Sequence, residues 1–231
     1  MFTLKNFTSR AVLDQQFAHQ VAQLLIQAIA EKGQASIAVS GGSTPKGFFQ
    51  ALSTHDLAWH KVTVTLVDER WVDVNSIDSN TRLVKENLLQ NKAAQANFFD
   101  LKVTDKLTQV TLESLNEKAK KNLLPFDVVI LGMGEDGHTA SLFPCSEQIK
   151  NALSLDNKHV LMSVSPKTAP YQRITFTLSA LLTSKNIFLH LNGENKQQVL
   201  TQALDDTNAL VMPIRAFLHH PTVNIQIMWA K

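Results

Sequence analysis

The sequence predicts one α/β domain over residues 1–231, built on a modified doubly wound (Rossmann-like), mainly parallel sheet with helices on both faces. First, its expected strands are near-continuous apolar runs, which is typical of parallel strands buried on both faces. Second, amphipathic helical patterns separate these runs. Third, six of the chain's 8 glycines gather in two strand-to-helix turns, where backbone must bend tightly or approach a ligand.

The expected helices follow from apolar residues that recur at three- and four-residue spacing. The first covers residues 8–33, with a hydroxyl cap at its start and Gly33 as its stop. Pro45 opens the second helix as a first-turn proline, preceded by the capping hydroxyl of Thr44. Further helices are expected at residues 79–89, 105–123 and 194–204.

Short apolar runs, many of them rich in β-branched residues, predict the strands. The run VTVTLV at residues 62–67 is an example, and the run at residues 126–131 leads into the sequence GMGEDGH. The expected strands lie at residues 36–40, 62–67, 98–99, 126–131, 159–164, 187–191 and 223–229.

The polar and glycine-rich segments of the chain come directly after four of these strands. They are residues 41–44, 68–70, 132–138 and 193–196. In an open parallel sheet, ligands bind beyond the carboxyl ends of the strands. We therefore expect the four segments to meet in one binding site.

The composition argues against several functional classes. The net charge is only +2 and the densest basic run is KAKK, at residues 118–121, so nucleic-acid binding has no support. The single cysteine, Cys145, precludes an internal disulfide and fits a reducing compartment. No apolar run approaches the ~20 residues of a membrane span, and the N-terminus lacks the pattern of a secretory signal. We expect a cytoplasmic protein without membrane contact.

The first glycine-rich turn, SGGSTPKG, has the features of an anion-binding loop. It combines the backbone N–H groups of Gly41 and Gly42 with the hydroxyls of Ser43 and Thr44 at the start of a helix, whose dipole favours negative charge. It is neither a P-loop nor a dinucleotide fingerprint, because both spacings are absent. The alternative interpretation is a tight turn with a good cap. We favour binding of the phosphate of a small substrate.

Three cations could contact that phosphate: Arg70 follows an expected strand, Lys196 lies in the first turn of an expected helix, and Arg173 lies in the segment YQRITFTL. Arg70 offers a planar guanidinium, and Arg173 and Lys196 lie at plausible positions. The alternative for Arg70 is a surface ion pair with Glu69 or Asp73. A lysine in the first turn of a helix is disfavoured by the helix dipole unless an anion is nearby, which favours a functional Lys196.

His138 is the candidate for proton transfer. Its imidazole can take a proton from water and return it to a leaving group near neutral pH. Asp136, two residues upstream, could orient the ring. A loop histidine is otherwise more often structural, and we assign the other seven histidines to such roles. No spacing of histidine or cysteine typical of a metal site occurs.

These motifs together resemble a known enzyme family. The segments SGGSTP, VDERWV, LGMGEDGHTASLFP, RITFTLSALL and NGENK occur in the order found in 6-phosphogluconolactonases of the oxidative pentose phosphate pathway. The resemblance covers most of the chain, and GMGEDGHTASLFP is its most specific part. It implies the fold shared by sugar-phosphate isomerases and glucosamine-6-phosphate deaminases, and it implies that no cofactor is needed.

The resemblance also implies the reaction, the hydrolysis of 6-phospho-D-glucono-1,5-lactone to 6-phosphogluconate. His138, with Asp136, would deprotonate the water that attacks C1 and then protonate the ring oxygen. Backbone N–H groups of residues 132–137 would stabilise the oxyanion. We expect a monomer or a weak homodimer. The residues expected to bind the sugar-phosphate lactone are Gly41, Gly42, Ser43, Thr44, Asp68, Arg70, Gly132, Gly134, Arg173 and Lys196.

Two other functions fit parts of the pattern. Glucosamine-6-phosphate deaminases share the DGH turn, but that family places a glutamate just before the proline that closes the turn, where this chain has Phe143. A sugar-phosphate-sensing domain of a transcriptional regulator would share the fold. It would need a helix-turn-helix, for which the first helix begins too near Met1, and it would have no need for His138.

Overall fold

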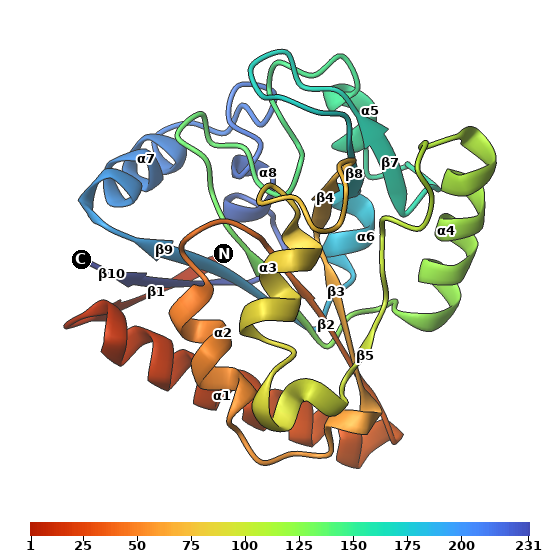
Figure 1. Ribbon diagram of the computed structural model, residues 1–231. Coiled ribbons are helices and arrows are strands. Elements are labelled where there is room, and N and C mark those ends of the chain that lie inside the picture. Colours follow the sequence, from red (N-terminus) through yellow and green to blue (C-terminus); the bar gives the residue numbers. More distant parts are fainter.

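A sheet of seven parallel strands forms the centre of the protein, which a computed structural model describes over residues 1–231 (Figure 1). Every neighbouring pair in it is parallel, as the apolar runs predict. In spatial order the strands are β1 (Phe2–Phe7), β10 (Ile225–Ala230), β9 (Asn186–Asn192), β6 (Val128–Leu131), β2 (Ala35–Val39), β3 (Val62–Leu66) and β5 (Asn97–Phe98).

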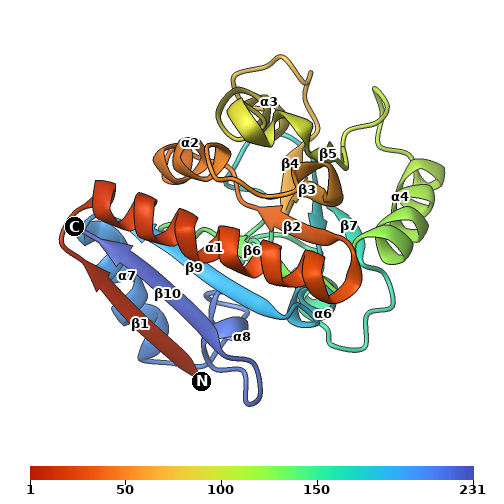
Figure 2. The same ribbon diagram turned by 90° about the horizontal axis from the view of Figure 1, so that it is seen from below.

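Helices lie on both faces of this sheet, which confirms the predicted α/β class. The helices α1 and α2 cover one face, and α7 and α8 lie on the other (Figures 1 and 2). Two short 3-10 helices span Trp59–Lys61 and Asn91–Gln95. The α-helices are α1 (Arg10–Lys32), α2 (Lys46–Ser53), α3 (Asn80–Asn87), α4 (Gln109–Asn122), α5 (Ile149–Ala152), α6 (Leu178–Leu182), α7 (Glu194–Leu204) and α8 (Arg215–Leu218).

A second, smaller sheet is antiparallel and was not expected. Its strands are, in spatial order, β4 (Asp68–Arg70), β8 (Arg173–Phe176) and β7 (Leu161–Val164). The prediction that residues 159–164 join the parallel sheet is therefore wrong. Apolar periodicity marks a strand but does not say which strand it pairs with.

Several element boundaries also differ from the sequence prediction. The strand β1 was missed, and its outward exposure gives it no continuous apolar pattern. The helix expected from residue 105 begins at Gln109, because the hydroxyl of Thr108 accepts a hydrogen bond from the N–H of Thr111 and so caps it there. The helix α2 has Pro45 itself at its cap position and no side-chain cap, so Thr44 does not cap it.

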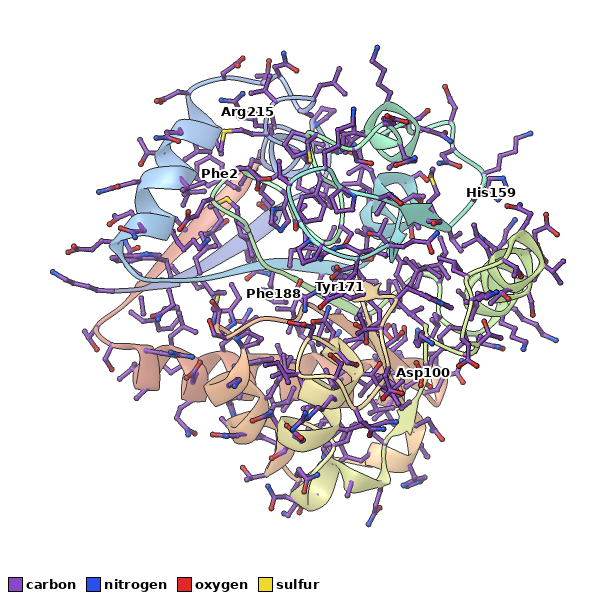
Figure 3. The ribbon with its side chains drawn as sticks, turned by 45° about the horizontal axis from the view of Figure 1, so that its top comes forward. Phe2, Asp100, His159, Tyr171, Phe188 and Arg215 are labelled. Atoms are coloured by element: carbon purple, nitrogen blue, oxygen red, sulfur yellow. The ribbon has the colours of Figure 1, made fainter.

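The helix α1 matches its prediction closely and organises one side of the core. Ser9 caps it at the start, and Gly33 ends it in the left-handed conformation at φ 80°. Its Phe17 is fully buried and stacks on Phe48 of α2 at 4.5 Å between ring centroids. Phe188 of β9 lies 5.0 Å from the same ring, near the middle of the molecule (Figure 3).

A histidine is buried in this aromatic cluster. His190 of β9 is 3% exposed, contacts Phe17 and Phe48 edge-on, and has no hydrogen-bond partner on either ring nitrogen. Burial, and then repulsion from Arg10, lowers its pKa to about 3. The neighbouring carboxylate of Asp14, 3.9 Å away, has its pKa raised by burial, partly offset by Arg10 and by the backbone N–H of Phe48.

The free energy of unfolding should therefore fall as the pH is lowered from 7 to 5. The unfolded chain takes up a proton on His190 near its ordinary pKa of ~6.5, whereas the folded protein does not, so acid favours unfolding. The contribution over this interval is about 2 kcal/mol. Urea titrations at several pH values measure it. His190→Asn should flatten the pH slope, and His60→Asn, at an exposed position, should leave it unchanged. Equal slopes for all three proteins would contradict the assignment.

Candidate active site

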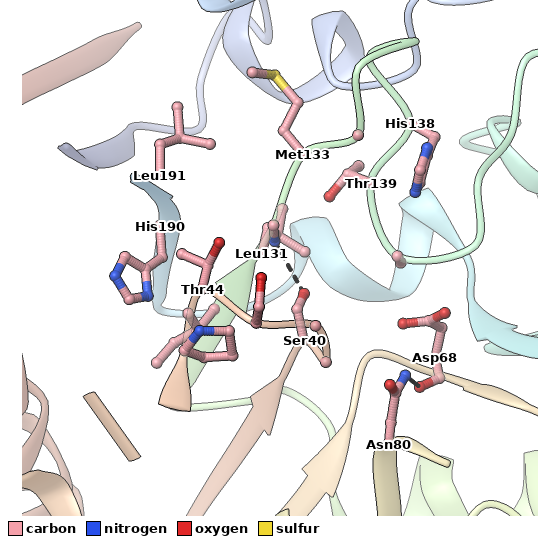
Figure 4. A pocket seen from close by; sticks show the side chains of 18 of the residues that line it. Ser40, Thr44, Asp68, Asn80, Leu131, Met133, His138, Thr139, His190 and Leu191 are labelled. Carbon is pink, nitrogen blue, oxygen red and sulfur yellow. Dashed lines mark hydrogen bonds between the residues drawn. The ribbon is translucent and has the colours of Figure 1, made fainter. Parts of the chain in front are cut away.

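The four segments that follow strands β2, β3, β6 and β9 meet in one pocket, as predicted (Figure 4). Parallel pairing places the carboxyl ends of these strands at one edge of the sheet. Asp136 alone among the predicted residues does not line the pocket, but it contacts a residue that does. The predicted residues that line it are Gly41, Gly42, Ser43, Thr44, Asp68, Arg70, Gly132, Gly134, His138, Arg173 and Lys196.

The two glycine-rich turns are neighbours because β2 pairs with β6. Beyond the last paired residues, the N–H of Ser40 donates to the carbonyl of Ile130 at 3.0 Å. The N–H of Gly132 in turn donates to the Ser40 hydroxyl at 3.0 Å. Ser40 therefore ties the start of one turn to the start of the other.

The first turn leaves its donors free to bind a ligand. The backbone N–H groups of residues 41–44 donate to no protein acceptor, and the hydroxyls of Ser43 and Thr44 have no hydrogen-bond partner in the protein. Arg10 of α1 donates from behind to the carbonyls of Ser43 and Thr44, at 2.9 and 3.1 Å. These contacts hold the carbonyls away from the pocket and add a positive charge beneath the turn. The arrangement suits an anion.

Gly41 is required by a close approach rather than by its backbone angles. A Cβ at this position would overlap the side-chain amide of Asn80, at the start of α3. That amide donates to the carbonyl of Asp68 at 3.0 Å, so Asn80 joins two of the pocket's segments. The turn after β2 therefore packs directly on the residues that follow β3.

A buried carboxylate holds this second region in place. Glu69 is fully buried, and its oxygens accept hydrogen bonds from the N–H groups of Arg70, Asn80 and Thr81 at 2.7 to 2.9 Å. The Ser79 hydroxyl donates to it as well, at 3.1 Å. Burial raises the pKa of Glu69, and these hydrogen bonds offset part of the rise. Glu69 thus caps α3 and fixes the backbone of Arg70, and no Arg70–Glu69 ion pair forms between the side chains.

Three cations and one carboxylate line the pocket. Arg70 donates to the carbonyl of Asp78 at 2.6 Å, which leaves its buried Nε without a partner. Arg173 is only 6% exposed, and its guanidinium lies 3.9 Å from Asp68. The hydroxyl of Ser141 donates to the same Asp68 carboxylate at 2.5 Å. Lys196, in the first turn of α7, makes no ion pair. The excess positive charge favours a phosphorylated ligand.

The second turn presents the imidazole. Nδ1 of His138 lies 2.5 Å from the Asp136 carboxylate, as expected from their spacing. Burial raises the pKa of Asp136, but the hydrogen bond and the attraction from His138 outweigh it, and the net pKa lies below the ordinary value. An ionised Asp136 is an acceptor, so it holds the Nδ1–H tautomer and leaves the Nε2 lone pair free. Gly134 lies so close to the ring that any Cβ would overlap it.

Phe143, which closes the turn, supports the same imidazole. Its ring stacks on His138 at 4.0 Å between centroids and 23° between planes. The Arg173 guanidinium lies over the Phe143 ring at 5.0 Å, a cation–π contact. Phe143 therefore orients two pocket residues at once without a charge of its own.

The expectation that the backbone of this turn binds an oxyanion is narrowed to part of the turn, because the N–H of Met133, which lines the pocket, and that of Glu135 have no acceptor in the protein. Four of its N–H groups already have acceptors inside the protein. Gly132 donates to Ser40, Gly134 to the carbonyl of His138, Gly137 to that of Gly134, and His138 to Asp136. A turn of this tightness closes on itself, which motif reading alone does not reveal. The amides of Gly132 and Gly134 are not free for a ligand.

The sequence prediction missed several pocket residues. These residues lie outside the motifs, or within them beside a residue with a clearer chemical signal. They include Ser40, Asn80, Thr139 and His190. Arg10, behind the first turn, carried no signal, because its partners are carbonyls 33 and 34 residues away. Asn80 had one usable signal, its place at the N-terminus of a helix that begins just after β3 and β4.

No group of three or more His, Cys, Asp or Glu side chains is arranged to hold a metal ion. None of the helices is both long and apolar enough to cross a membrane.

Comparison with known proteins places the chain among sugar-phosphate enzymes. The family described as glucosamine-6-phosphate isomerases/6-phosphogluconolactonase matches residues 8–229. A 6-phosphogluconolactonase of Rhizobium meliloti is 42% identical over 97% of both chains. One of Neisseria meningitidis is 40% identical over the whole of both chains.

Solved structures agree with this. A 6-phosphogluconolactonase from Shewanella baltica superposes with a TM-score of 0.96 at 42% identity, over 100% of this chain and 98% of the other. A monomeric glucosamine-6-phosphate deaminase superposes with a TM-score of 0.78 at 17% identity, which shows a shared fold alone. With a family match that spans nearly the whole chain and full-length relatives at about 40% identity, the protein belongs to the glucosamine-6-phosphate isomerase/6-phosphogluconolactonase family.

Proposed function

We propose that this protein is a 6-phosphogluconolactonase that hydrolyses 6-phospho-D-glucono-1,5-lactone to 6-phosphogluconate, with His138 as the general base. One observation carries the proposal: His138 lines the same pocket as the turn at residues 41–44, whose backbone N–H groups are unpaired. Asp136 lies just outside the pocket and contacts the His138 ring. The names of the full-length relatives support the same reaction.

The phosphate binds at the first turn in this proposal. The free N–H groups of residues 41–44 and the hydroxyls of Ser43 and Thr44 supply neutral donors. Arg70 and Lys196 supply charge at the pocket wall, and Arg173 lies closer to His138 through their shared contact with Phe143. An anchored phosphate holds the lactone ring in place, which converts the attack of water into an oriented step.

The imidazole then performs proton transfer. Nε2 of His138 takes a proton from a water molecule as the water oxygen attacks C1 of the lactone. The carbonyl oxygen becomes an alkoxide in a tetrahedral intermediate. When the intermediate collapses, the bond between C1 and the ring oxygen breaks, and the protonated His138 gives its proton to that oxygen. Asp136 stays ionised throughout and stabilises the imidazolium.

Every group in this scheme belongs to one chain, and every step is a proton transfer or the making and breaking of a C–O bond. We therefore propose a sugar-phosphate lactone as the partner, without a cofactor, a metal ion or a second copy of the chain. The expected deaminase glutamate is replaced by Phe143, which packs on His138. No observation on this pocket favours the deaminase reaction over lactone hydrolysis.

His138→Asn should lower kcat for the lactone by about 10²–10⁴, the usual contribution of a general base, while the protein still folds and binds 6-phosphogluconate. The measurement is a rapid assay of freshly prepared lactone coupled to 6-phosphogluconate dehydrogenase. Glucosamine 6-phosphate serves as the comparison substrate and should not react. His159→Asn is the matched control, because His159 is exposed at the edge of the molecule (Figure 3). An undiminished rate in His138→Asn would exclude the assigned role.

Arg70→Ala should chiefly raise KM, by about 10- to 100-fold, since a hydrogen bond to a charged group contributes about 1.5–3 kcal/mol. The loss should be specific to the phosphate, so hydrolysis of the unphosphorylated glucono-1,5-lactone should change little. Lys92→Ala, a cation outside the pocket that pairs with Asp56, is the control. A KM that stays at the wild-type value would remove Arg70 from the phosphate site.

A further inference from the structure

The proposed hydrolysis needs hydrogen-bond donors for the alkoxide that forms on C1, and only part of the backbone of the catalytic turn is free to supply them. The N–H groups of Gly132, Gly134 and His138 are already used within the protein, as is that of Gly137. The free N–H groups of residues 41–44 lie in the other turn, where the phosphate binds in the proposal. Beside the imidazole, the N–H of Met133 still has no acceptor in the protein, and an oxyanion site commonly combines such an amide with a further donor.

The hydroxyl of Thr139 has the properties of that further donor. Thr139 directly follows His138, lines the pocket and is 1% exposed. Its Oγ1 is fully buried and has no hydrogen-bond partner. Figure 4 shows this hydroxyl directed from the catalytic turn into the pocket, on the same side as His138. A buried hydroxyl without a partner destabilises the folded protein unless a bound molecule pairs with it.

Packing alone does not require a threonine here. The backbone carbonyl of Thr139 accepts a hydrogen bond from the N–H of Leu142 at 3.0 Å, which closes the turn without the side chain. Valine has the same branched shape and would fill the same space. The buried threonines differ in this respect: Oγ1 of Thr65 donates to the carbonyl of Phe99 at 2.8 Å, whereas the hydroxyls of Thr81 and Thr139 have no partner. Of these two, only Thr139 lines the pocket.

We propose that Thr139 is a further catalytic residue, whose hydroxyl donates a hydrogen bond to the oxyanion that develops on C1 of the lactone. The inference rests on the proposed lactonase function. As the water oxygen bonds to C1, the electron pair of the carbonyl π bond moves to the carbonyl oxygen, and the Thr139 O–H points at this new charge. When the ring oxygen leaves, the pair returns to rebuild the carbonyl. Thr139 keeps its own proton throughout, and His138 carries the proton that moves.

The test compares Thr139→Val, which removes only the hydroxyl, with Thr139→Ser, which keeps it. Thr139→Val should lower kcat by about 10²-fold, the effect of losing one oxyanion donor, with KM nearly unchanged. Thr139→Ser should restore kcat to within a few-fold of the wild-type value. Inhibition by inorganic phosphate, which has no C1 oxygen, should be equal in all three proteins.

Stability measurements separate this role from a structural one. Thr139→Val should keep or raise the melting temperature, because it deletes an unpaired buried hydroxyl. The matched control Thr65→Val should show the reverse, a lower melting temperature at unchanged kcat, because it breaks a buried hydrogen bond away from the pocket. This pair of opposite effects is expected only if the Thr139 hydroxyl acts on the substrate.

Three results would overturn the inference. They are a Thr139→Val enzyme with wild-type kcat, equal losses in Thr139→Val and Thr139→Ser, and a loss confined to KM. If the wild-type protein hydrolyses the lactone and any of these is found, the proposed function stands and only the role of Thr139 fails. A wild-type protein without lactonase activity would overturn both.

Discussion

The parallel pairing of β2 with β6 is the constraint on which the rest of the site depends. It brings the carboxyl ends of the two strands to adjacent places on one edge of the sheet. The strands are distant in sequence: the contacting residues Ser36 and Asp127 are 91 positions apart. Ser40 extends this pairing by one more step through its contacts with Ile130 and Gly132. The turn at residues 41–44 and the turn that carries His138 are consequently held side by side by backbone hydrogen bonds of the sheet and by the Ser40 hydroxyl.

The two turns differ in how many of their backbone N–H groups are hydrogen-bonded within the protein. The turn at residues 41–44 leaves its N–H groups free and has its carbonyls held back by Arg10, so it can bind a charged group. The turn at residues 132–138 satisfies most of its own N–H groups and is correspondingly rigid. Such a turn suits the general-base role proposed for His138, which requires a fixed ring position.

Phe143 positions two side chains of the pocket. The proline-closed turn places this residue against the imidazole, and here an uncharged ring stacks on His138 and contacts Arg173. A stacked phenyl ring fixes the orientation of the imidazole without adding a carboxylate to the site. Asp136 is then the one carboxylate hydrogen-bonded to the ring. A single partner on Nδ1 leaves Nε2 without a hydrogen bond inside the protein.

Glu69 and Asp68 show that the small antiparallel sheet matters as much as the large one. Glu69 caps α3 from β4 and thereby fixes the backbone of Arg70, and Arg173 reaches Asp68 from the neighbouring strand β8. The small antiparallel sheet therefore positions Arg70 and Arg173. No local sequence pattern predicted that these strands form a separate sheet. Its strands are three and four residues long, too short for periodicity to be read.

The sequence by itself determined the α/β class, most strands of the parallel sheet, the first helix and the two turns that carry the chemistry. These depend on local properties: apolar periodicity, capping residues and the concentration of glycine. It also located His138 and Asp136, because their contact spans two residues. Tertiary structure alone decided the antiparallel sheet, the use of Arg10 and Asn80, and which donors remain free. Each of these depends on partners that are distant in sequence, and whether an N–H or a hydroxyl is free is a property of the completed hydrogen-bond network.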